Sequence, residues 1–263
     1  MSLGLRFVGV GNANAPELGS ACGALERDGV PLLMIDCGPE ALSAWLAHYA
    51  ALPPAVYVTH THMDHVGGME RLFYQAWFDP ARRGRLRVYA HAKLIPLLQA
   101  RVADFPEPLA EGGVNYWDAF QLVPCSRGFW HEGLWFEVFA TRHHAPETSY
   151  GLALPGSVVW TGDTRPIPEM LGHHAGRGEL VAHDCSLQGN PSHSGTDDLA
   201  REYPSELRQR LVLYHYGSEA EAAAMQRGGW RVARRGELLA LAPPLMRHAP
   251  ASEPAERGAT PGP

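Results

Sequence analysis

The sequence predicts an α/β fold in which two β-sheets pack face to face and helices cover both outer faces, a four-layer αββα sandwich. Short apolar runs typical of buried strands alternate with amphipathic helical segments along most of the chain. The strand-then-helix rhythm of the first half also recurs in the second half. The length of 263 residues, of which 45% are hydrophobic and 19% charged, favours one water-soluble domain.

The first half contains the clearest strand and helix patterns. Residues 3–10 read as a strand that runs into a loop containing glycine and asparagine. Between residues 40 and 49, Leu42, Trp45, Leu46 and Tyr49 recur at spacings of three and four, which predicts a helix. Further strands are expected at 31–35, 55–59 and 86–90, and further helices at 66–78 and 93–102.

The second half continues this pattern. Consecutive strands rich in aromatic residues are expected over 114–142, followed by a hairpin that turns at Pro155 and Gly156. Short late strands are expected at 180–182 and 211–214, with helices at 196–203 and 219–227. We expect residues 1–242 to form the domain. Residues 243–263 consist mainly of Pro, Ala, Glu and Gly, which predicts a disordered tail without a role in the site.

The net charge and the distribution of apolar residues limit the classes of partner that we expect. The net charge of −6 disfavours a stable complex with long nucleic acid, since such binding relies on many Lys and Arg side chains. A compact anionic substrate remains compatible with it. No run approaches the roughly 18 apolar residues of a membrane span, and the N-terminal residues lack the pattern of a secretory signal. We therefore expect a cytoplasmic protein that does not associate with membranes.

A histidine-rich string, HTHMDHVGG, begins directly after the strand expected at 55–59. It places four potential metal ligands, His60, His62, Asp64 and His65, within six residues. Imidazole nitrogens and carboxylate oxygens are ligands that zinc and similar ions prefer. Alternation along an extended segment directs His60 and His62 to one side, and the following turn brings Asp64 and His65 to an adjacent point. This spacing predicts two neighbouring metal ions.

Two other polar residues follow apolar strands. Asp163, in the string TGDTRP, comes after the run Val158–Trp160, and His215 follows the strand expected at 211–214. A carboxylate at the end of a buried strand needs a partner of opposite charge. We therefore expect Asp163 and His215 to join the histidine-rich string along one rim of the fold.

The string HTHMDHVGG resembles the signature of the metallo-β-lactamase-fold hydrolases. Other segments are similar, in order, to the phosphodiesterase branch of that superfamily, which includes transfer-RNA 3′-processing endonucleases. These segments, spread over residues 3–241, are FVGVGNANAP, LLMIDCGPE, HHAPETSYGLAL, VVWTGDTRP and LYHYG. The resemblance implies an αββα sandwich of the metallo-β-lactamase type and a site for two Zn²⁺ ions, with Mn²⁺ or Fe²⁺ as alternatives.

The resemblance also implies a ligand set. His60, His62 and a later histidine would hold one ion. Asp64, His65 and His215 would hold the other, with Asp163 between the two. The later histidine is His143 or His144, and the usual spacing to Gly151 in family members favours His144.

The same resemblance implies a mechanism. Two metal ions about 3.5–4 Å apart lower the pKa of a bridging water towards neutrality, so a metal-bridging hydroxide would attack the phosphodiester. Asp64 would also orient that water. His193, in PSHSGTDDL, matches a histidine thought to protonate the leaving group, with Asp184 as a candidate to orient a histidine. Alternatively, His193 is only a neighbour of a helix N-terminal cap.

The substrate is expected to be a small phosphodiester, most of all a cyclic nucleotide. Transfer-RNA-processing members carry a long arm before the bridging aspartate, whereas only a short hairpin separates Gly151 from Asp163 here. The alternatives are a lactone or ester hydrolase, an RNA 3′-processing nuclease, and a non-catalytic metal-containing nucleotide-binding protein. A homodimer is compatible with the resemblance. Arg165 resembles the form seen in RNA-processing members and could equally pair locally.

Overall fold

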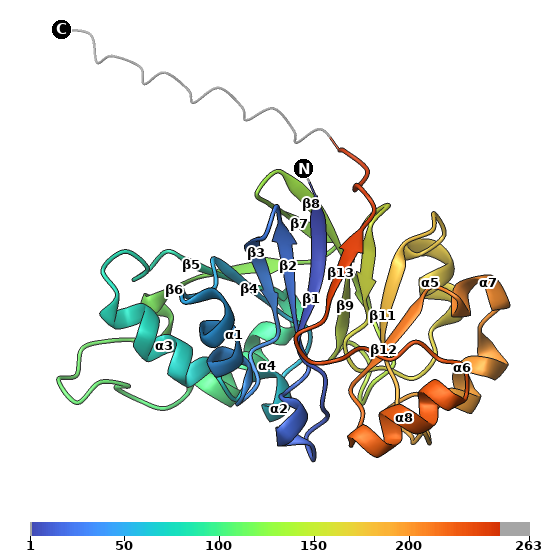
Figure 1. Cartoon of the computed structure of the whole chain (residues 1–263). Helices are drawn as coiled ribbons and strands as arrows, with labels where there is room; N and C mark the ends of the chain where they lie inside the picture. The colour runs from blue at the N-terminus through green and yellow to red at the C-terminus, as the bar shows by residue number, and fades with distance from the viewer. Residues whose placement is uncertain (1, 248–263) are drawn as a thin grey trace, which may run out of the picture.

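The computed structural model describes residues 2–247, which form the predicted four-layer αββα sandwich (Figure 1). Two sheets face one another, and helices cover both outer sides. The first sheet is covered by α1 (Ala41–Tyr49), α3 (Met69–Phe78) and α4 (Ile95–Leu98). The second is covered by α5 (Pro168–His174), α6 (Thr196–Glu202), α7 (Ser205–Arg208) and α8 (Glu219–Arg227).

The first sheet has seven strands in the order β13-β1-β2-β3-β4-β5-β6. They are β1 (Leu3–Gly9), β2 (Cys22–Arg27), β3 (Val30–Ile35), β4 (Ala55–Val58), β5 (Leu86–His91), β6 (Phe120–Cys125) and β13 (Leu238–Leu241). Strands β3 to β6 are parallel, whereas β13, β1, β2 and β3 pair antiparallel. The loops that follow the parallel strands β3 and β4 therefore open at the same edge of the sheet.

The second sheet has six strands in the order β12-β11-β10-β9-β8-β7. They are β7 (Gly128–His131), β8 (Leu134–Ala140), β9 (Tyr150–Leu154), β10 (Val158–Trp160), β11 (Leu180–Asp184) and β12 (Leu211–Tyr214). Strands β10 to β12 are parallel. The predicted hairpin is confirmed, since β9 and β10 pair antiparallel around a turn in which Gly156 has a φ of 78°.

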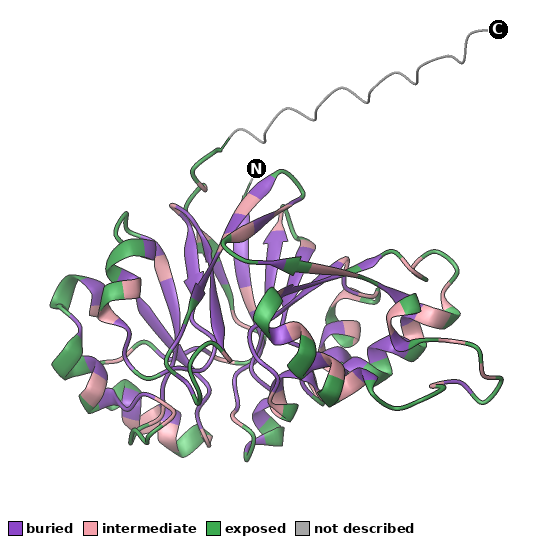
Figure 2. Cartoon of the chain, turned by 180° about the vertical axis from the view of Figure 1, so that it is seen from behind, coloured by how far each residue is buried: buried purple, intermediate pink, exposed green. Residues whose placement is uncertain are grey.

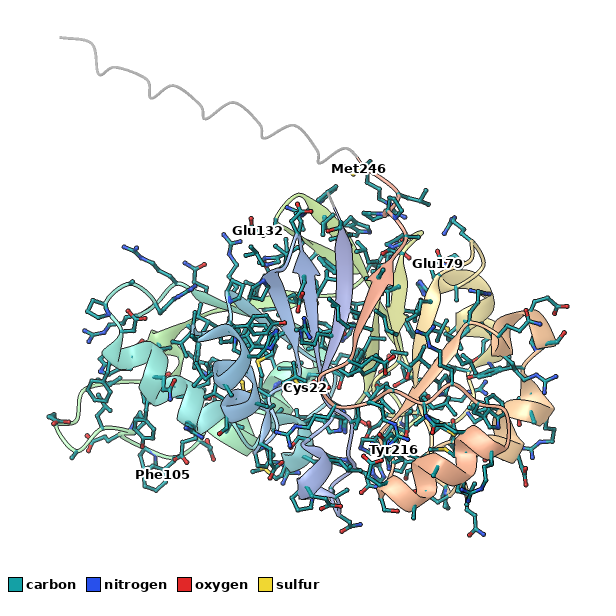
Figure 3. The ribbon with its side chains drawn as sticks, viewed as in Figure 1. Cys22, Phe105, Glu132, Glu179, Tyr216 and Met246 are labelled. Carbon is teal, nitrogen blue, oxygen red and sulfur yellow. The ribbon has the colours of Figure 1, made fainter. Side chains whose placement is uncertain are left out.

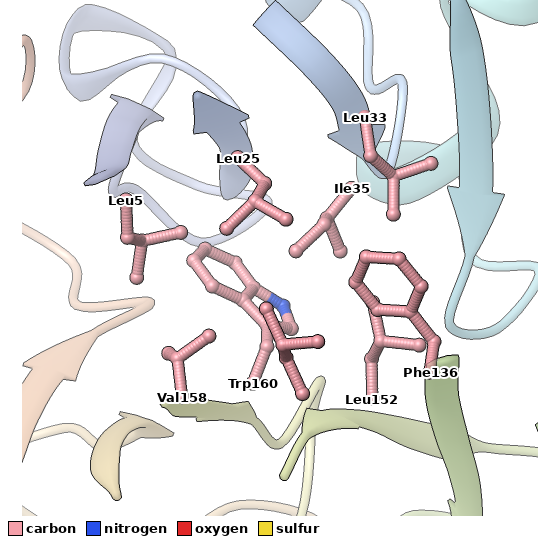
Figure 4. A pocket seen from close by; sticks show the side chains of 9 residues that line it. Leu5, Leu25, Leu33, Ile35, Phe136, Leu152, Val158 and Trp160 are labelled. Atoms are coloured by element: carbon pink, nitrogen blue, oxygen red, sulfur yellow. The ribbon is translucent and has the colours of Figure 1, made fainter. Parts of the chain in front are cut away.

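The core lies between the two sheets. Figure 2 shows the strands as largely buried, while the helices turn exposed faces outward. Figure 4 shows side chains from both sheets meeting around a gap of only about 10 Å³, so the sheets are close-packed. The first sheet contributes Leu5, Leu25, Leu33 and Ile35, and the second contributes Phe136, Leu152, Val158 and Trp160.

Several elements differ from the prediction. The sequence patterns did not indicate β2 or β13. Strand β2 contains Gly23 and Ala24, which are poor strand formers, and its pairing with β1 and β3 supplies what local propensity lacks. The helix expected at 66–78 is divided into α2 (Met63–Val66) and α3 around Gly67 and Gly68. A Cβ on Gly68 would lie 2.4 Å from the carbonyl oxygen of Gly38, so the close approach requires glycine.

The helix expected at 93–102 is a series of short helical pieces: η2 (Ala92–Leu94), α4 and η3 (Gln99–Ala103). Pro96 stands in the first turn of α4, where its missing N–H is tolerated. In the described part of the chain, no helix has the length and apolar character needed to cross a membrane.

The predicted tail is described only as far as Arg247. Its first residues lie against the second sheet, where the Leu245 backbone N–H donates to the Pro155 carbonyl at 2.8 Å. The Arg247 guanidinium pairs with Glu137 at 2.6 Å. Met246 lies at the opposite end of the molecule from Tyr216, which directly follows His215 (Figure 3). Residues 248–263 of that predicted tail lie outside the described residues.

Candidate active site

The ends of β4, β10, β11 and β12 bring together the polar residues expected at the site. His60 follows β4, Asp163 follows β10, and His215 follows β12. Three groups of potential ligands result, in each of which the ligand atoms lie within 4.8 Å of one another. The first group is His60, His62, His143 and Asp163, the second is Asp64, His65, Asp163 and His215, and the third is Asp163, Asp184, His193 and His215. Asp163 belongs to all three, and it joins the first two as expected of a carboxylate between two ions.

The later histidine that lies in this cluster is His143, whereas the resemblance favoured His144. The Nε2 of His143 lies 3.1 Å from His62 Nδ1 and 3.8 Å from Asp163 Oδ2. His144 is exposed, with its Nδ1 3.4 Å from the Ser192 hydroxyl. Backbone alternation explains the choice, because Thr141 and His143 are both buried while their neighbours point outward. The buried Thr141 donates to the Asp163 carbonyl at 3.2 Å.

Several buried polar atoms in this cluster have no hydrogen-bond partner among the described residues. They are His60 Nε2, His65 Nε2, both carboxylate oxygens of Asp163 and one oxygen of Asp184. Buried polar atoms in proteins are nearly always satisfied, so their convergence calls for a further group. Imidazole nitrogen and carboxylate oxygen are suitable ligands for divalent ions, so these residues fit two metal ions.

Asp36, at the end of β3, holds the His65 ring through a hydrogen bond at Nδ1. One carboxylate oxygen accepts from the His65 ring at Nδ1 (2.8 Å) and from the Thr59 hydroxyl (2.7 Å). The other oxygen accepts from the Thr59 backbone N–H at 2.8 Å. This pairing fixes the imidazole with Nε2 directed into the cluster. The sequence patterns assigned no role to Asp36, although it is a charged residue after a buried strand, as Asp163 is.

Asp184, at the end of β11, contacts two histidines. Its Oδ2 accepts from His193 Nδ1 at 2.8 Å and from the Thr164 backbone N–H at 2.8 Å. Its Oδ1 lies 3.3 Å from His215 Nδ1. The geometry therefore agrees with the prediction that Asp184 orients a histidine, and it adds His215 as a second one.

Burial and neighbouring charges shift the pKa values of these groups in opposite directions. Burial lowers the pKa of His60 well below its ordinary value, so this imidazole is neutral. Burial also opposes charge on His65 and His215, but the nearby carboxylates outweigh it. Asp163 and Asp36 raise the pKa of His65 well above its ordinary value, and Asp163 and Asp184 raise that of His215 to about 10.

The neighbouring histidines also lower the pKa of Asp163. Burial opposes ionisation of Asp163, yet His215, His65 and His60 hold its pKa well below the usual range. Without bound cations, protons on His65 and His215 thus balance part of the carboxylate charge. Binding of metal ions requires both imidazoles to release these protons, because only the neutral ring is a ligand.

A cavity of about 180 Å³ opens over the cluster. The ligand residues His62, Asp64, Asp163 and His215 line it together with His193. Its other lining residues are Asn12, Ala13, Asn14, Ser186 and Asn190. Burial opposes charge on His193, but its contact with Asp184 raises the pKa of the imidazole above its ordinary value. A histidine that retains its proton beside the cavity is suited to donate it.

Comparison with known proteins identifies the family. Residues 3–239 match the family model described as Anti-Pycsar protein Apyc1. The chain belongs to the Apyc1 family. The Apyc1 protein of Saccharibacillus brassicae is 32% identical over 226 residues, which cover 83% of this chain and 92% of that protein. The Apyc1 protein of Bacillus phage BSP38 is 26% identical over 265 residues, which cover 90% and 98% of the two chains.

Solved structures confirm the fold. The metallo-beta-lactamase fold protein YhfI from Bacillus subtilis superposes with a TM-score of 0.73 at 15% identity, covering 91% of this chain and all of that one. The short form of human tRNase Z gives a TM-score of 0.64 at 18% identity, covering 90% and 98% of the two chains. The metallo-β-lactamase fold predicted from the sequence is therefore confirmed. The Apyc1 family confirms the predicted activity class, a metal-dependent phosphodiesterase acting on cyclic nucleotides.

Proposed function

We propose that this chain hydrolyses a cyclic nucleotide at the cavity above the His/Asp cluster, with two metal ions as cofactors. One ion is held by His60, His62, His143 and Asp163. The other is held by Asp64, His65, Asp163 and His215. The observation that carries the proposal is the convergence of buried nitrogen and oxygen atoms without partners, with Asp163 common to both groups.

Zinc fits this donor set best, since it favours histidine nitrogen and carboxylate oxygen, with Mn²⁺ and Fe²⁺ as alternatives. Such ions, when bound, would supply an activated water and would stabilise negative charge that develops on the phosphate. Two carboxylates that hydrogen-bond or pair with the proposed ligand histidines are also present. Asp36 and Asp184 each fix a histidine ring, which raises its basicity as a ligand.

Asp64 and His193 are assigned to the proton and water chemistry. The Asp64 side chain is 15% exposed, its Oδ2 lies 3.4 Å from His215 Nε2, and the residue lines the cavity. It can accept a hydrogen bond from an attacking water and orient it. His193 binds Asp184 through Nδ1, so Nε2 is the atom that can donate a proton to the departing ribose oxygen.

A small substrate suits the architecture. The β9–β10 hairpin is short, and no arm for gripping a long nucleic acid emerges between Gly151 and Asp163. The modest cavity volume and the net charge of −6 point the same way. The substrate proposed is therefore a 3′,5′-cyclic nucleotide, hydrolysed to a linear monophosphate.

Elemental analysis combined with turnover tests this proposal. The purified protein is expected to contain about two equivalents of a transition metal, to release a linear nucleotide from at least one cyclic nucleotide, and to lose both properties after chelation. Adding Zn²⁺ or Mn²⁺ back should restore activity. Full metal loading without cyclic-nucleotide turnover, but with lactone turnover, would favour the lactonase alternative.

A further inference from the structure

The cavity over the His/Asp cluster is smaller than the pockets that bury a whole small organic ligand. Pockets that bury a small organic ligand generally measure about 300–1,000 Å³, whereas this cavity measures about 180 Å³. With its phosphate above the ligand residues, a cyclic nucleotide must extend beyond the cavity. A second hollow of about 220 Å³ lies next to it, and Asn190 lines both.

Three of the seven residues that line the second hollow are arginines, and two others, Asp198 and Glu202, carry carboxylates. Arg142 follows β8, Arg165 precedes α5, and Arg201 lies on α6, so three separate segments contribute one guanidinium each. Helices α5 and α6 lie on the same side of the molecule (Figure 1). We call this region the arginine hollow; it is lined by Arg142, Arg165, Pro166, Asn190, Asp198, Arg201 and Glu202.

Two of these guanidiniums are already engaged. Arg142 pairs with Glu169 at 2.8 Å and donates to the Pro166 carbonyl at 3.0 Å. Arg201 pairs with Asp198 at 2.6 Å. The guanidinium of Arg165 makes no ion pair or hydrogen bond with any residue in the described range 2–247. Its backbone is held, however, since its N–H donates to the Arg142 carbonyl at 2.8 Å. Arg165 therefore offers free donors from a fixed position two residues after Asp163.

Asn190 is fixed in a similar way. Its side-chain oxygen accepts from the backbone N–H groups of Ser192 (2.8 Å) and His193 (3.0 Å). The oxygen is thereby occupied, whereas the side-chain NH₂ makes no hydrogen bond with the described residues, and Asn190 lines both the cavity and the arginine hollow. The two carboxylates of the hollow, Asp198 and Glu202, are paired with Arg201 at 2.6 and 3.1 Å. The donors left open are the Arg165 guanidinium and the Asn190 NH₂, which have no acceptor capacity and therefore suit a ligand edge rich in acceptors.

We propose that the arginine hollow binds the nucleobase of the cyclic nucleotide, with Arg165 and Asn190 donating hydrogen bonds to acceptor atoms on the base edge. This inference rests on the proposed function, since it takes the phosphate and ribose to occupy the cavity. A guanidinium matches the paired acceptors O6 and N7 of guanine and also the O4 of uracil, whereas adenine presents an amino donor beside N7. Guanine and uracil are thus the bases that Arg165 favours.

The test compares Arg165→Ala with a matched surface variant, Arg85→Ala. Arg85 is exposed and lies just before β5, outside both hollows. We expect Arg165→Ala to raise KM for the guanine and uracil cyclic nucleotides about tenfold, the effect of losing one hydrogen bond to a charged donor. The rise should be smaller for the adenine nucleotide and smaller still for bis-p-nitrophenyl phosphate, which has no base. The Kd of the corresponding linear monophosphate, measured by calorimetry, should rise in parallel.

A second pair of variants tests Asn190. Asn190→Asp keeps an oxygen for the Ser192 and His193 backbone donors but replaces the NH₂ donor by an acceptor. Asn115→Asp is its control, because the Asn115 oxygen accepts from the Trp117 backbone N–H in a comparable turn away from the site. We expect Asn190→Asp, but not Asn115→Asp, to raise KM more for cyclic nucleotides than for bis-p-nitrophenyl phosphate.

Arg165→Lys distinguishes base recognition from simple attraction of an anion. Lysine keeps the charge but not the planar paired donors, so it should not restore the base-dependent KM values. Full restoration by lysine would overturn base recognition, and so would equal losses on bis-p-nitrophenyl phosphate or no difference from Arg85→Ala. A wild-type protein that is loaded with metal but turns over no cyclic nucleotide would instead refute the proposed function itself.

Discussion

Two buried carboxylates stand behind the cluster, and they differ in what they support. Asp36, at the end of β3, contacts one histidine, His65, and its oxygens also accept from the Thr59 hydroxyl and backbone. Asp184, at the end of β11, is shared between His193 and His215. One carboxylate therefore orients a single metal-facing ring, whereas the other connects a metal-facing ring to the proposed proton donor.

The two sheets therefore differ in how their buried carboxylates hold the histidine rings. The first sheet holds its histidine in a closed hydrogen-bonded arrangement around Asp36. The second sheet places Asp184 so that one charge affects two rings: Oδ2 accepts from His193 Nδ1 at 2.8 Å, and Oδ1 lies 3.3 Å from His215 Nδ1. The proposed proton donor, His193, is thus held by a carboxylate of the second sheet. Substitutions of Asp36 and of Asp184 should therefore differ in their effects on metal affinity and kcat.

The largest effect is expected from Asp163→Ala, because Asp163 belongs to both ligand groups and joins the two sides. Activity and metal affinity should both fall by more than the roughly 10–100-fold expected for loss of an outer partner. Elemental analysis and cyclic-nucleotide turnover measure these effects. A variant that kept two metal equivalents and near-normal turnover would contradict the placement of Asp163 between the ions.

His193→Ala should be next, with kcat on a cyclic nucleotide reduced about 10²- to 10⁴-fold through loss of the general acid. Metal content should stay near that of the unmodified protein. Bis-p-nitrophenyl phosphate should suffer much less, since its leaving group departs without a proton. Equal losses on both substrates would argue against His193 as the proton donor.

Asp184→Asn should combine two defects, because it weakens the support of both His193 and His215. We expect metal affinity to fall about 10–100-fold and kcat on the cyclic nucleotide to fall even when metal is saturating. Titration with a metal chelator and turnover at high Zn²⁺ separate the two. If saturating metal restored kcat fully, Asp184 would have no influence on the proton donor.

Asp36→Asn should give the smallest change of the four and the simplest. Metal affinity should fall by about tenfold or more through the loosened His65 ring, whereas saturating metal should restore kcat. Thermal unfolding followed by circular dichroism controls for a general loss of structure, since Asp36 is fully buried. If kcat of Asp36→Asn stayed low with saturating metal, the two carboxylates would not differ in the way proposed.

The sequence and the structure agree best where ligands are contiguous. His60, His62, Asp64 and His65 lie within six residues after one strand, so their common location follows from local geometry alone. Between His143 and His144, the spacing to Gly151 favoured His144, whereas the alternation of buried residues from Thr141 places His143 in the cluster. Strand β2 was missed because its own composition is weak and its pairing partners stabilise it.

The sequence by itself determined the αββα class, the short hairpin in place of an arm, and the ligand run after β4, since each depends on residues close together in the chain. Only the tertiary structure decided that Asp36 pairs with His65, that Asp184 serves both His193 and His215, and that Arg165 opens beside the cavity. The contacts of Asp36 and Asp184 join residues that follow different strands. Their distances are set by how the two sheets pack, and no local pattern encodes that packing.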